Sequence, residues 1–347
     1  MSKGGFMSFS NMAAFHGCAK KISINELSSL LSKLPKCTDA DVLLGLDGAD
    51  DVVAYKINDT DAIIQSLDFM PPITTDPYIF GQVVAANALS DIYAKGCTPL
   101  FALNILSYPL KSSPMDDLEK ILLGGADKAK EAGICVIGGH SVDGDEPYYG
   151  MSVTGIARIG SIVLNSTAKP GDMLFLTKPI GTGAVLNGVK YHLLSADSLD
   201  EVITNMCNLN KAASEAMMAV GVNACTDITG FGLLGHLYEM IKASDVGASI
   251  KFSDIPFMEG VFSMNETDAL PIASLHTLQH IDCSIDWVSN YSDYKKRILA
   301  DPQTSGGLLI AISKMKAAQL VDAFQQNNLF IACIGEITEG NSNIKII

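Results

Sequence analysis

A cluster of turn-forming residues in the middle of the chain constrains its fold more than any other feature. Residues Asn165–Asp172 read Asn-Ser-Thr-Ala-Lys-Pro-Gly-Asp, a composition that interrupts both helices and strands. On either side of it, apolar strand-like runs alternate with long helical segments. We therefore predict an α+β fold with two mixed α/β domains, over residues 23–164 and 165–347, preceded by a mobile leader over residues 1–22.

The expected elements follow from periodicity and from the residues that begin and end them. In the first half, helices are expected from Ser23, over Ile79–Lys95 and from Ser113 to about Ala132. Strands are expected over Val52–Ile57, Ala62–Leu67, Leu100–Leu106, Ile134–Ile137 and Tyr148–Arg158. In the second half, strands are expected at Met173–Thr177, 248–252, Leu308–Ile312 and 329–337, and helices at 181–190, 198–220, 231–243 and 315–327. We expect these helices to cover the second sheet.

Charge and cysteine usage limit the class of protein. The chain of 347 residues carries 24 Lys and Arg against 38 Asp and Glu, a net charge of −14, which argues against nucleic acid or an anionic membrane as the main partner. No apolar run approaches the ~18 residues of a membrane span, and residues 1–20 lack the apolar region of a secretory signal. The eight cysteines form no Cys-x-x-Cys pair, and most lie in apolar runs, such as Cys135. We expect most of them to be buried free thiols, which suits a cytoplasmic protein.

Several carboxylates have placements that make more sense beside a cation. Asp51 lies at the entry to a strand, Asp91 lies near the negative C-terminal end of a helix, and Asp227 lies next to a glycine-rich turn. Asp68 closes a predicted strand, and Asn87 precedes Asp91 by four residues on the same helix face. Any one of these is most simply a solvated loop or cap residue, but as a set they favour Mg²⁺ and phosphate binding.

Two glycine-rich segments offer different interpretations. Gly138-Gly139-His140-Ser141 follows an apparently buried strand, so its backbone amides could hold a phosphate, although a plain strand-end turn is an equal alternative. The segment Gly230–Gly235 fits Gly-x-Gly-x-x-Gly and precedes a helix. Asp227 would repel a pyrophosphate there unless a cation lay between them, so a dinucleotide site is disfavoured against a tight helix–helix contact.

A reactive thiol is indicated near the N-terminus. In Gly17-Cys18-Ala19-Lys20-Lys21, two ammonium groups lie beside one thiol, which should lower the pKa of Cys18. The segment ends the leader, so we expect a reactive group on a mobile lid; an ordinary free cysteine beside solvated lysines is the alternative.

Taken together, these motifs resemble the selenophosphate synthetase (selenide, water dikinase) family, of the aminoimidazole ribonucleotide synthetase-like superfamily. The resemblance runs from about Phe15 to the C-terminus. Its matching stretches are Gly17-Cys18 with Lys21-Ile22-Ser23, Asp50-Asp51, Asp68-Phe69, Asn87–Ile92, Gly138–Asp143, Thr226–His236 and Asp301–Gly307.

The resemblance implies homodimers whose N-terminal sheets join into a barrel, with ATP bound near that interface. It implies the reaction ATP + selenide + water → selenophosphate + AMP + phosphate, dependent on Mg²⁺ and typically helped by K⁺. The selenium could come as selenide or from a protein donor.

Individual roles are implied in the same way. Cys18 matches the catalytic Cys or selenocysteine, and Lys21 matches the lysine needed for phosphoryl transfer. Asp51, Asp91 and Asp227 match the Mg²⁺ ligands. The implied nucleotide contacts are Lys21, Gly48, Ala49, Asp50, Asp68, Asp91, Gly139, His140 and Ser141. The chain departs from the common Gly-Cys-Gly-Cys-Lys pattern, because Lys20 replaces the second cysteine and Ala19 replaces a glycine.

Three other functions remain open from the sequence. One is another ATP-using member of the superfamily, such as a thiamine monophosphate kinase, against which the Cys18 and Lys21 pair argues. Another is a dinucleotide-binding oxidoreductase built on Gly230–Gly235. The third is a non-catalytic relative that binds nucleotide only.

Overall fold

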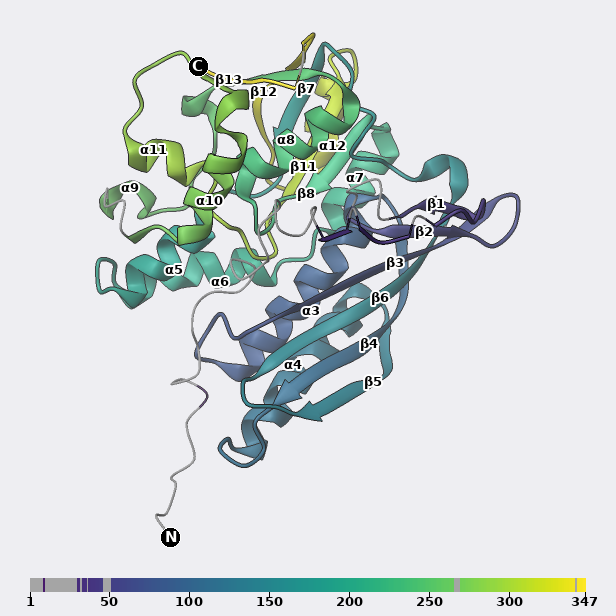
Figure 1. The fold of residues 1–347 in the computed structure, drawn as a ribbon, viewed down its shortest axis with the longest axis vertical. Coiled ribbons are helices and arrows are strands. Elements are labelled where there is room, and N and C mark those ends of the chain that lie inside the picture. The colour runs from purple at the N-terminus through teal and green to yellow at the C-terminus, as the bar shows by residue number, and fades with distance from the viewer. Residues whose placement is uncertain are drawn as a thin grey trace.

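The computed structural model describes residues 9, 30–31, 33–35, 37–45, 51–264, 269–340 and 342–347. The expected helix from Ser23 lies mostly outside these residues, as do Cys18, Lys21, Gly48, Ala49 and Asp50. Within the described part, the chain forms two mixed α/β units, each built on one sheet (Figure 1). This confirms the predicted fold class.

The N-terminal sheet has six strands in the order β1-β2-β3-β6-β4-β5. Its strands are β1 (Val42–Leu44), β2 (Val53–Lys56), β3 (Asp61–Met70), β4 (Thr98–Tyr108), β5 (Cys135–Asp143) and β6 (Tyr148–Arg158). Only β4 and β5 pair in parallel, and all other neighbours are antiparallel.

Two helices, α3 (Pro77–Ala94) and α4 (Met115–Ala132), cover one face of this sheet (Figure 1). The side chain of Asp76 begins α3 by accepting hydrogen bonds from the amides of Tyr78 and Ile79. A Cβ on Gly124 would lie 2.0 Å from the carbonyl oxygen of Tyr78, so the two helices pack with their backbones in contact. This close packing leaves α3 almost wholly buried, which explains its uniformly apolar sequence.

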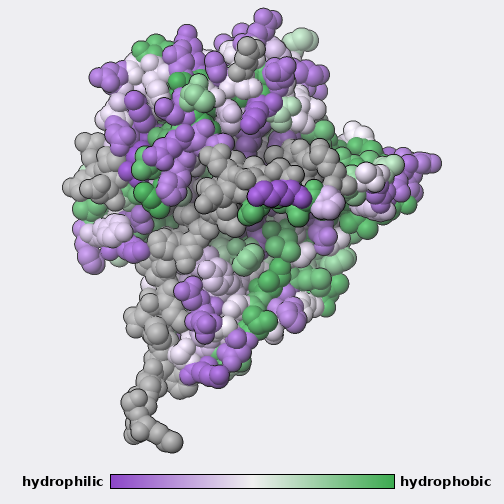
Figure 2. Space-filling model, viewed as in Figure 1, coloured by the Kyte–Doolittle hydropathy of each residue, from purple (hydrophilic) through white to green (hydrophobic). Residues whose placement is uncertain are grey.

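The other face of the N-terminal sheet is left open within the chain. Alternate residues of β3, including Ile63, Leu67 and Phe69, are exposed, while their neighbours are buried against α3. Figure 2 shows hydrophobic side chains gathered over this sheet. We call this surface the open face and define it by Tyr55, Ile63, Leu67, Phe69, Leu103 and Val142.

The C-terminal sheet has seven strands in the order β10-β13-β9-β12-β7-β11-β8. Its strands are β7 (Asp172–Leu176), β8 (Ala224–Asp227), β9 (Gly247–Ile250), β10 (Ile285–Trp287), β11 (Leu308–Ser313), β12 (Ala332–Thr338) and β13 (Ile344–Ile346). The helices of this unit are α5 (Thr182–Lys190), α6 (Leu199–Cys207), α7 (Lys211–Val220), α8 (Gly232–Ser244), α9 (Val261–Met264), α10 (Ile272–Ile281), α11 (Asp293–Ile298) and α12 (Ala317–Gln326).

Helices cover both faces of the C-terminal sheet, as expected. Leu309 and Ala311 of β11 lie in the core cluster that contains α8. Leu308 and Ile310 lie in the cluster that contains α7 and α12. Because side chains alternate between faces, a strand covered on both sides is apolar at every position, and this explains the uninterrupted run of β11.

Two expected elements differ from the structure. The single helix over 198–220 is divided into α6 and α7, with residues 208–210 between them. The strand expected at Ile134–Ile137 is β5, which continues to Asp143, so Gly138–Ser141 lies inside a strand and not in a turn. The expectation that this strand is buried was wrong, because β5 is an edge strand that pairs only with β4.

The burial predicted for most cysteines was also wrong. Among the described residues, Cys97 and Cys225 are buried and Cys207 is half-buried, but the thiols of Cys37, Cys135, Cys283 and Cys333 are exposed. Cys135 is exposed because it begins the edge strand β5. None of the helices that the structure describes has the length and apolar character needed to cross a membrane.

Candidate functional site

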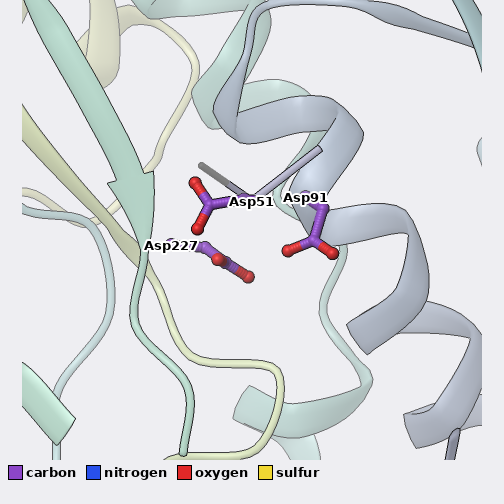
Figure 3. A group of neighbouring side chains, drawn as sticks. All are labelled: Asp51, Asp91 and Asp227. Atoms are coloured by element: carbon purple, nitrogen blue, oxygen red, sulfur yellow. The ribbon is translucent and has the colours of Figure 1, made fainter. Parts of the chain in front are cut away.

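Three carboxylates from distant parts of the sequence meet between the two units. Asp51 precedes β2, Asp91 lies in the last turn of α3, and Asp227 is the last residue of β8. One ligand atom from each lies within 4.8 Å of those of the other two. The three side chains point toward a common space (Figure 3). We call them the carboxylate cluster.

Asp51 is held in its ionised form by a buried lysine. The Nζ atom of Lys95, which ends α3, lies 2.7 Å from Oδ2 of Asp51, and Lys95 is fully buried. The hydroxyl of Thr226 also donates to this carboxylate at 3.0 Å. Burial alone would raise the pKa of Asp51, but the ion pair with Lys95 outweighs it, so this pKa is lowered.

Asp91 lies in the opposite electrostatic situation. Burial raises its pKa well above the ordinary value, and the negative charges of Asp68 and Asp227 raise it further. The hydroxyl of Ser66 on β3 donates a short hydrogen bond to Oδ2 of Asp91 and opposes this effect. Asp91 therefore favours a proton or another cation beside it.

Asp227 is buried and shares this tendency. Burial, and then the charge of Asp51, raise its pKa to about 6. Ser90 on α3 donates to its Oδ2 atom, and Asn210 in turn donates to the Ser90 hydroxyl at 2.8 Å. Helix α3 of the first unit thus orients a carboxylate that belongs to the second.

Asp68 adjoins the cluster without belonging to it. It lies inside β3, since this strand continues beyond its expected end at Leu67 to Met70. Its Oδ2 atom accepts a hydrogen bond of 2.8 Å from Nδ2 of Asn87, one turn before Asp91 on α3. The oxygen-rich cluster, flanked by Asp68, could hold a hard divalent cation such as Mg²⁺.

Gly139–Ser141 lies across the N-terminal sheet from Asp68, on the edge strand β5. Asp68 pairs with Met151, Met151 with Asn104, and Asn104 with Gly139. Three strand spacings amount to about 14 Å, so the chain does not bring Gly139 into contact with the cluster. The segment lines a cavity of about 440 Å³ between β4, β5 and α4.

The glycine-rich segment at 230–235 packs against protein. A Cβ on Gly232, whose φ is +66°, would lie 2.5 Å from the carbonyl carbon of Ala300. A Cβ on Gly235 would lie 3.2 Å from a methyl group of Thr277 on α10. A side chain at either glycine would crowd neighbouring protein atoms, so the segment is used for packing, including the contact of α8 with α10, which disfavours a dinucleotide site.

Sequence reasoning missed the residues that surround the cluster. Lys95 was assigned only to a helix end, Ser90 was included only within the Asn87–Ile92 stretch of the resemblance, and Ser66 and Asn210 were given no role. A lysine ending an otherwise apolar helix could have suggested a buried ion pair, whereas isolated serines could not have been recognised.

Comparison with known proteins separates the families that the sequence left open. Two family models match, the AIR synthase related protein N-terminal domain over residues 49–157 and the C-terminal domain over residues 169–347. A relative from Carboxydothermus hydrogenoformans named "Selenide, water dikinase" is 44% identical over 330 residues, which are 95% of this chain and 96% of the relative. The chain belongs to the selenide, water dikinase family. A relative of the same name from Clostridioides difficile is 44% identical over 93% of both chains.

More distant structures share the fold alone. Thiamine-monophosphate kinase from Stenotrophomonas maltophilia superposes with a TM-score of 0.68 at 17% identity, covering 94% of this chain and 96% of that one. The corresponding kinase from Aquifex aeolicus gives a TM-score of 0.63 at 16% identity, covering 94% and 98%. The selenide, water dikinase family therefore uses a scaffold that it shares with other kinases.

Proposed function

We propose that this chain is an ATP-dependent phosphotransferase that converts ATP, selenide and water to selenophosphate, AMP and phosphate. Two relatives named for this activity cover more than nine-tenths of the chain. The observation that carries the proposal is the meeting of three carboxylates from both units in one place, where Asp227 is buried and Asp51 and Asp91 are partly exposed. A chain with a net charge of −14 needs such a cation site to hold a polyphosphate.

The residues of the cluster fit Mg²⁺ chemically. Asp51, Asp91 and Asp227 would supply hard oxygen ligands, and the raised pKa values of Asp91 and Asp227 indicate buried acids that lack sufficient positive charge nearby. When bound, the ion would neutralise negative charge on the phosphates. Lys95 keeps Asp51 ionised, while Ser66 and Ser90 hold Asp91 and Asp227 in place for binding.

The nucleotide would lie against segments on either side of the cluster. We assign its contacts to Asp68 and Asp91 on the N-terminal unit, to the exposed backbone of Gly139, His140 and Ser141, and to the loop of Gly48, Ala49 and Asp50. The support for Gly48, Ala49 and Asp50 is the family resemblance. On the same basis, we propose potassium as an activator.

The chemical step would involve the leader. Lys21 would contact the nucleotide and stabilise charge on the transferred phosphoryl group, and Cys18 would bind or deliver selenium as a soft thiolate. Phosphoryl transfer depends mainly on positioning and charge compensation, so one lysine and three metal-binding carboxylates suffice. ADP would then be hydrolysed to AMP at the same site.

We also propose that two copies associate through the open face. Its apolar side chains, among them Leu67 and Phe69, are more than half exposed in the single chain. A contiguous apolar surface of this kind is typical of an interface. Pairing of the two N-terminal sheets would bury it, in agreement with the barrel that the resemblance implies.

Phosphorus NMR of a reaction containing ATP and selenide tests the activity directly. A phosphorus signal coupled to selenium, with AMP as the nucleotide product, is expected. Replacing Cys18→Ser should abolish selenide-dependent ATP consumption and leave Mg–ATP binding, while Cys283→Ser, at an exposed thiol, serves as the matched control. ATP consumption without a selenium-coupled signal would refute the proposed reaction, and full turnover by the Cys18 variant would refute its role.

A further inference from the structure

Lys178 is a buried lysine with an unusual set of partners. It lies just beyond the end of β7, with 7% of its surface exposed. Its Nζ atom donates to the main-chain carbonyls of Asn205 at 2.9 Å, Asn208 at 2.7 Å and Ser305 at 2.9 Å. These three bonds tie the ammonium group to the backbone, and the negative charge of Asp227 also acts on it and favours its charged form.

The partners of Lys178 belong to the end of α6 and to the loop before β11. Asn205 lies in the last turn of α6, and Asn208 directly follows that helix, before α7. Ser305 lies in the buried loop before β11 and has a φ of +49°, in the left-handed region that non-glycine residues rarely adopt. Burial lowers the pKa of Lys178 to about 7, so keeping a charge here is costly. A strained backbone retained beside such a cation indicates a function for its geometry.

The peptide groups at Ser305 connect Lys178 to Asp68. The Ser305 carbonyl accepts from Lys178, and the Ser305 amide donates to Oδ1 of Asn87 at 2.7 Å. This bond fixes which way the Asn87 amide faces, because its oxygen must point to Ser305. The Nδ2 atom of Asn87 is thereby directed to Asp68, to which it donates at 2.8 Å.

A second series of hydrogen bonds links the same loop to the carboxylate cluster. The carbonyl of Gly306 accepts from Nδ2 of Asn210 at 2.8 Å. Asn210 also donates to the hydroxyl of Ser90, which donates to Asp227. The loop held by Lys178 is therefore linked to Asp68 through one side chain, Asn87, and to Asp227 through two, Asn210 and Ser90.

We propose that Lys178 is a positioning residue for the nucleotide: by holding the Ser305 peptide, it makes Asn87 orient the Asp68 carboxylate. The inference rests on the nucleotide contact proposed above for Asp68. Residues that orient a binding group through hydrogen bonds commonly change affinity about tenfold when they are removed.

A double-mutant cycle tests this coupling. Binding of AMPPNP with Mg²⁺ is measured by calorimetry for the intact chain, Lys178→Met, Asp68→Asn and the double variant. Lys178→Met should weaken binding about tenfold, and should raise the KM for ATP by a similar factor with less than a threefold change in kcat. The double variant should lose clearly less affinity than the product of the two single losses, because part of the effect of Lys178 passes through Asp68.

Two further variants make the test decisive. Lys316→Met also removes a lysine that donates to two main-chain carbonyls, those of Val220 and Gly221, and should leave nucleotide affinity unchanged. If Lys178→Met does not fold, Lys178→Arg keeps the charge and the donors, and any loss of affinity it causes must likewise be smaller in the Asp68→Asn background.

The outcomes separate this inference from the proposed function. Independent, multiplying effects of the Lys178 and Asp68 variants would overturn the inference while leaving the nucleotide site intact. Unchanged affinity in Lys178→Met would overturn it as well. Absence of Mg–nucleotide binding by the intact chain would instead refute the proposed function.

Discussion

The carboxylate cluster and the open face are unfavourable for opposite reasons. In the cluster, Asp227 is buried and Asp91 is half-buried, and burial raises the pKa of both acids. On the open face, apolar side chains such as Leu67 and Phe69 are left in water. The first region has too little positive charge around it, and the second has too little apolar surface covering it.

This difference teaches what each region is expected to bind. A buried acid is stabilised by a proton or a cation, and an exposed apolar surface is stabilised by another apolar surface. Substitutions in the cluster should therefore change metal and nucleotide binding with little effect on association between copies. Substitutions on the open face should do the reverse.

The largest effect is expected from Asp227→Asn. Loss of one charged ligand should weaken Mg–ATP binding about a hundredfold, while the free energy of unfolding without metal should stay the same or rise, because a buried charge is removed. Calorimetry and urea unfolding measure the two quantities. Asp286→Asn, at an exposed acid on β10, is the control. Unchanged affinity in the Asp227 variant would remove Asp227 from the metal site.

The next effect is expected from Leu67→Glu on the open face. A charge in the centre of an apolar interface should raise the dissociation constant of the dimer more than tenfold, since it must be desolvated on association. Sedimentation velocity measures the change. Leu123→Glu, at a similarly exposed leucine on α4, should leave association intact. Equal behaviour of the two variants would show that the open face is not the interface.

Asp301→Asn tests whether burial alone destabilises an ionised carboxylate outside the carboxylate cluster. Burial raises the pKa of Asp301 to about 7, although the Gly183 amide and Gln303 donate to it. The folded protein therefore favours the protonated carboxyl of Asp301. The contribution of this group to the free energy of unfolding is complete below pH 4 and is lost as pH rises through 7. Between pH 5 and pH 8 the stability of the variant should gain about 2–3 kcal/mol relative to the intact chain in urea unfolding. Parallel pH profiles would contradict this expectation.

The smallest effect is expected from His140→Ala on β5. Its side chain is exposed, so the free energy of unfolding should change by less than about 0.5 kcal/mol. If His140 contacts nucleotide, ATP affinity should fall about threefold to tenfold in the calorimetric measurement. His276→Ala, at an exposed histidine on α10, should change neither quantity. Unchanged affinity in the His140 variant would exclude that histidine from the nucleotide site.

Much of the fold was predictable because it depends on local patterns. The run of Ala and Val over 79–95 and the glycine after it located α3 within two residues at its start and one at its end. Alternation located β6 at Tyr148–Arg158. The division of the predicted helix over 198–220 was missed, because residues 208–210 leave the helix to meet Lys178 and Ser90, both distant in sequence.

By itself, the sequence determined the two-unit α/β organisation, most element positions and, through its motifs, the family. Side-chain periodicity and capping act between residues a few positions apart, so they can be read from the chain. Only the tertiary structure decided that β5 is an exposed edge, that Lys95 pairs with Asp51, and that Lys178 holds the loop at Ser305. These outcomes depend on which distant segments lie together, and hydrogen bonding and burial of charge are settled only once they do.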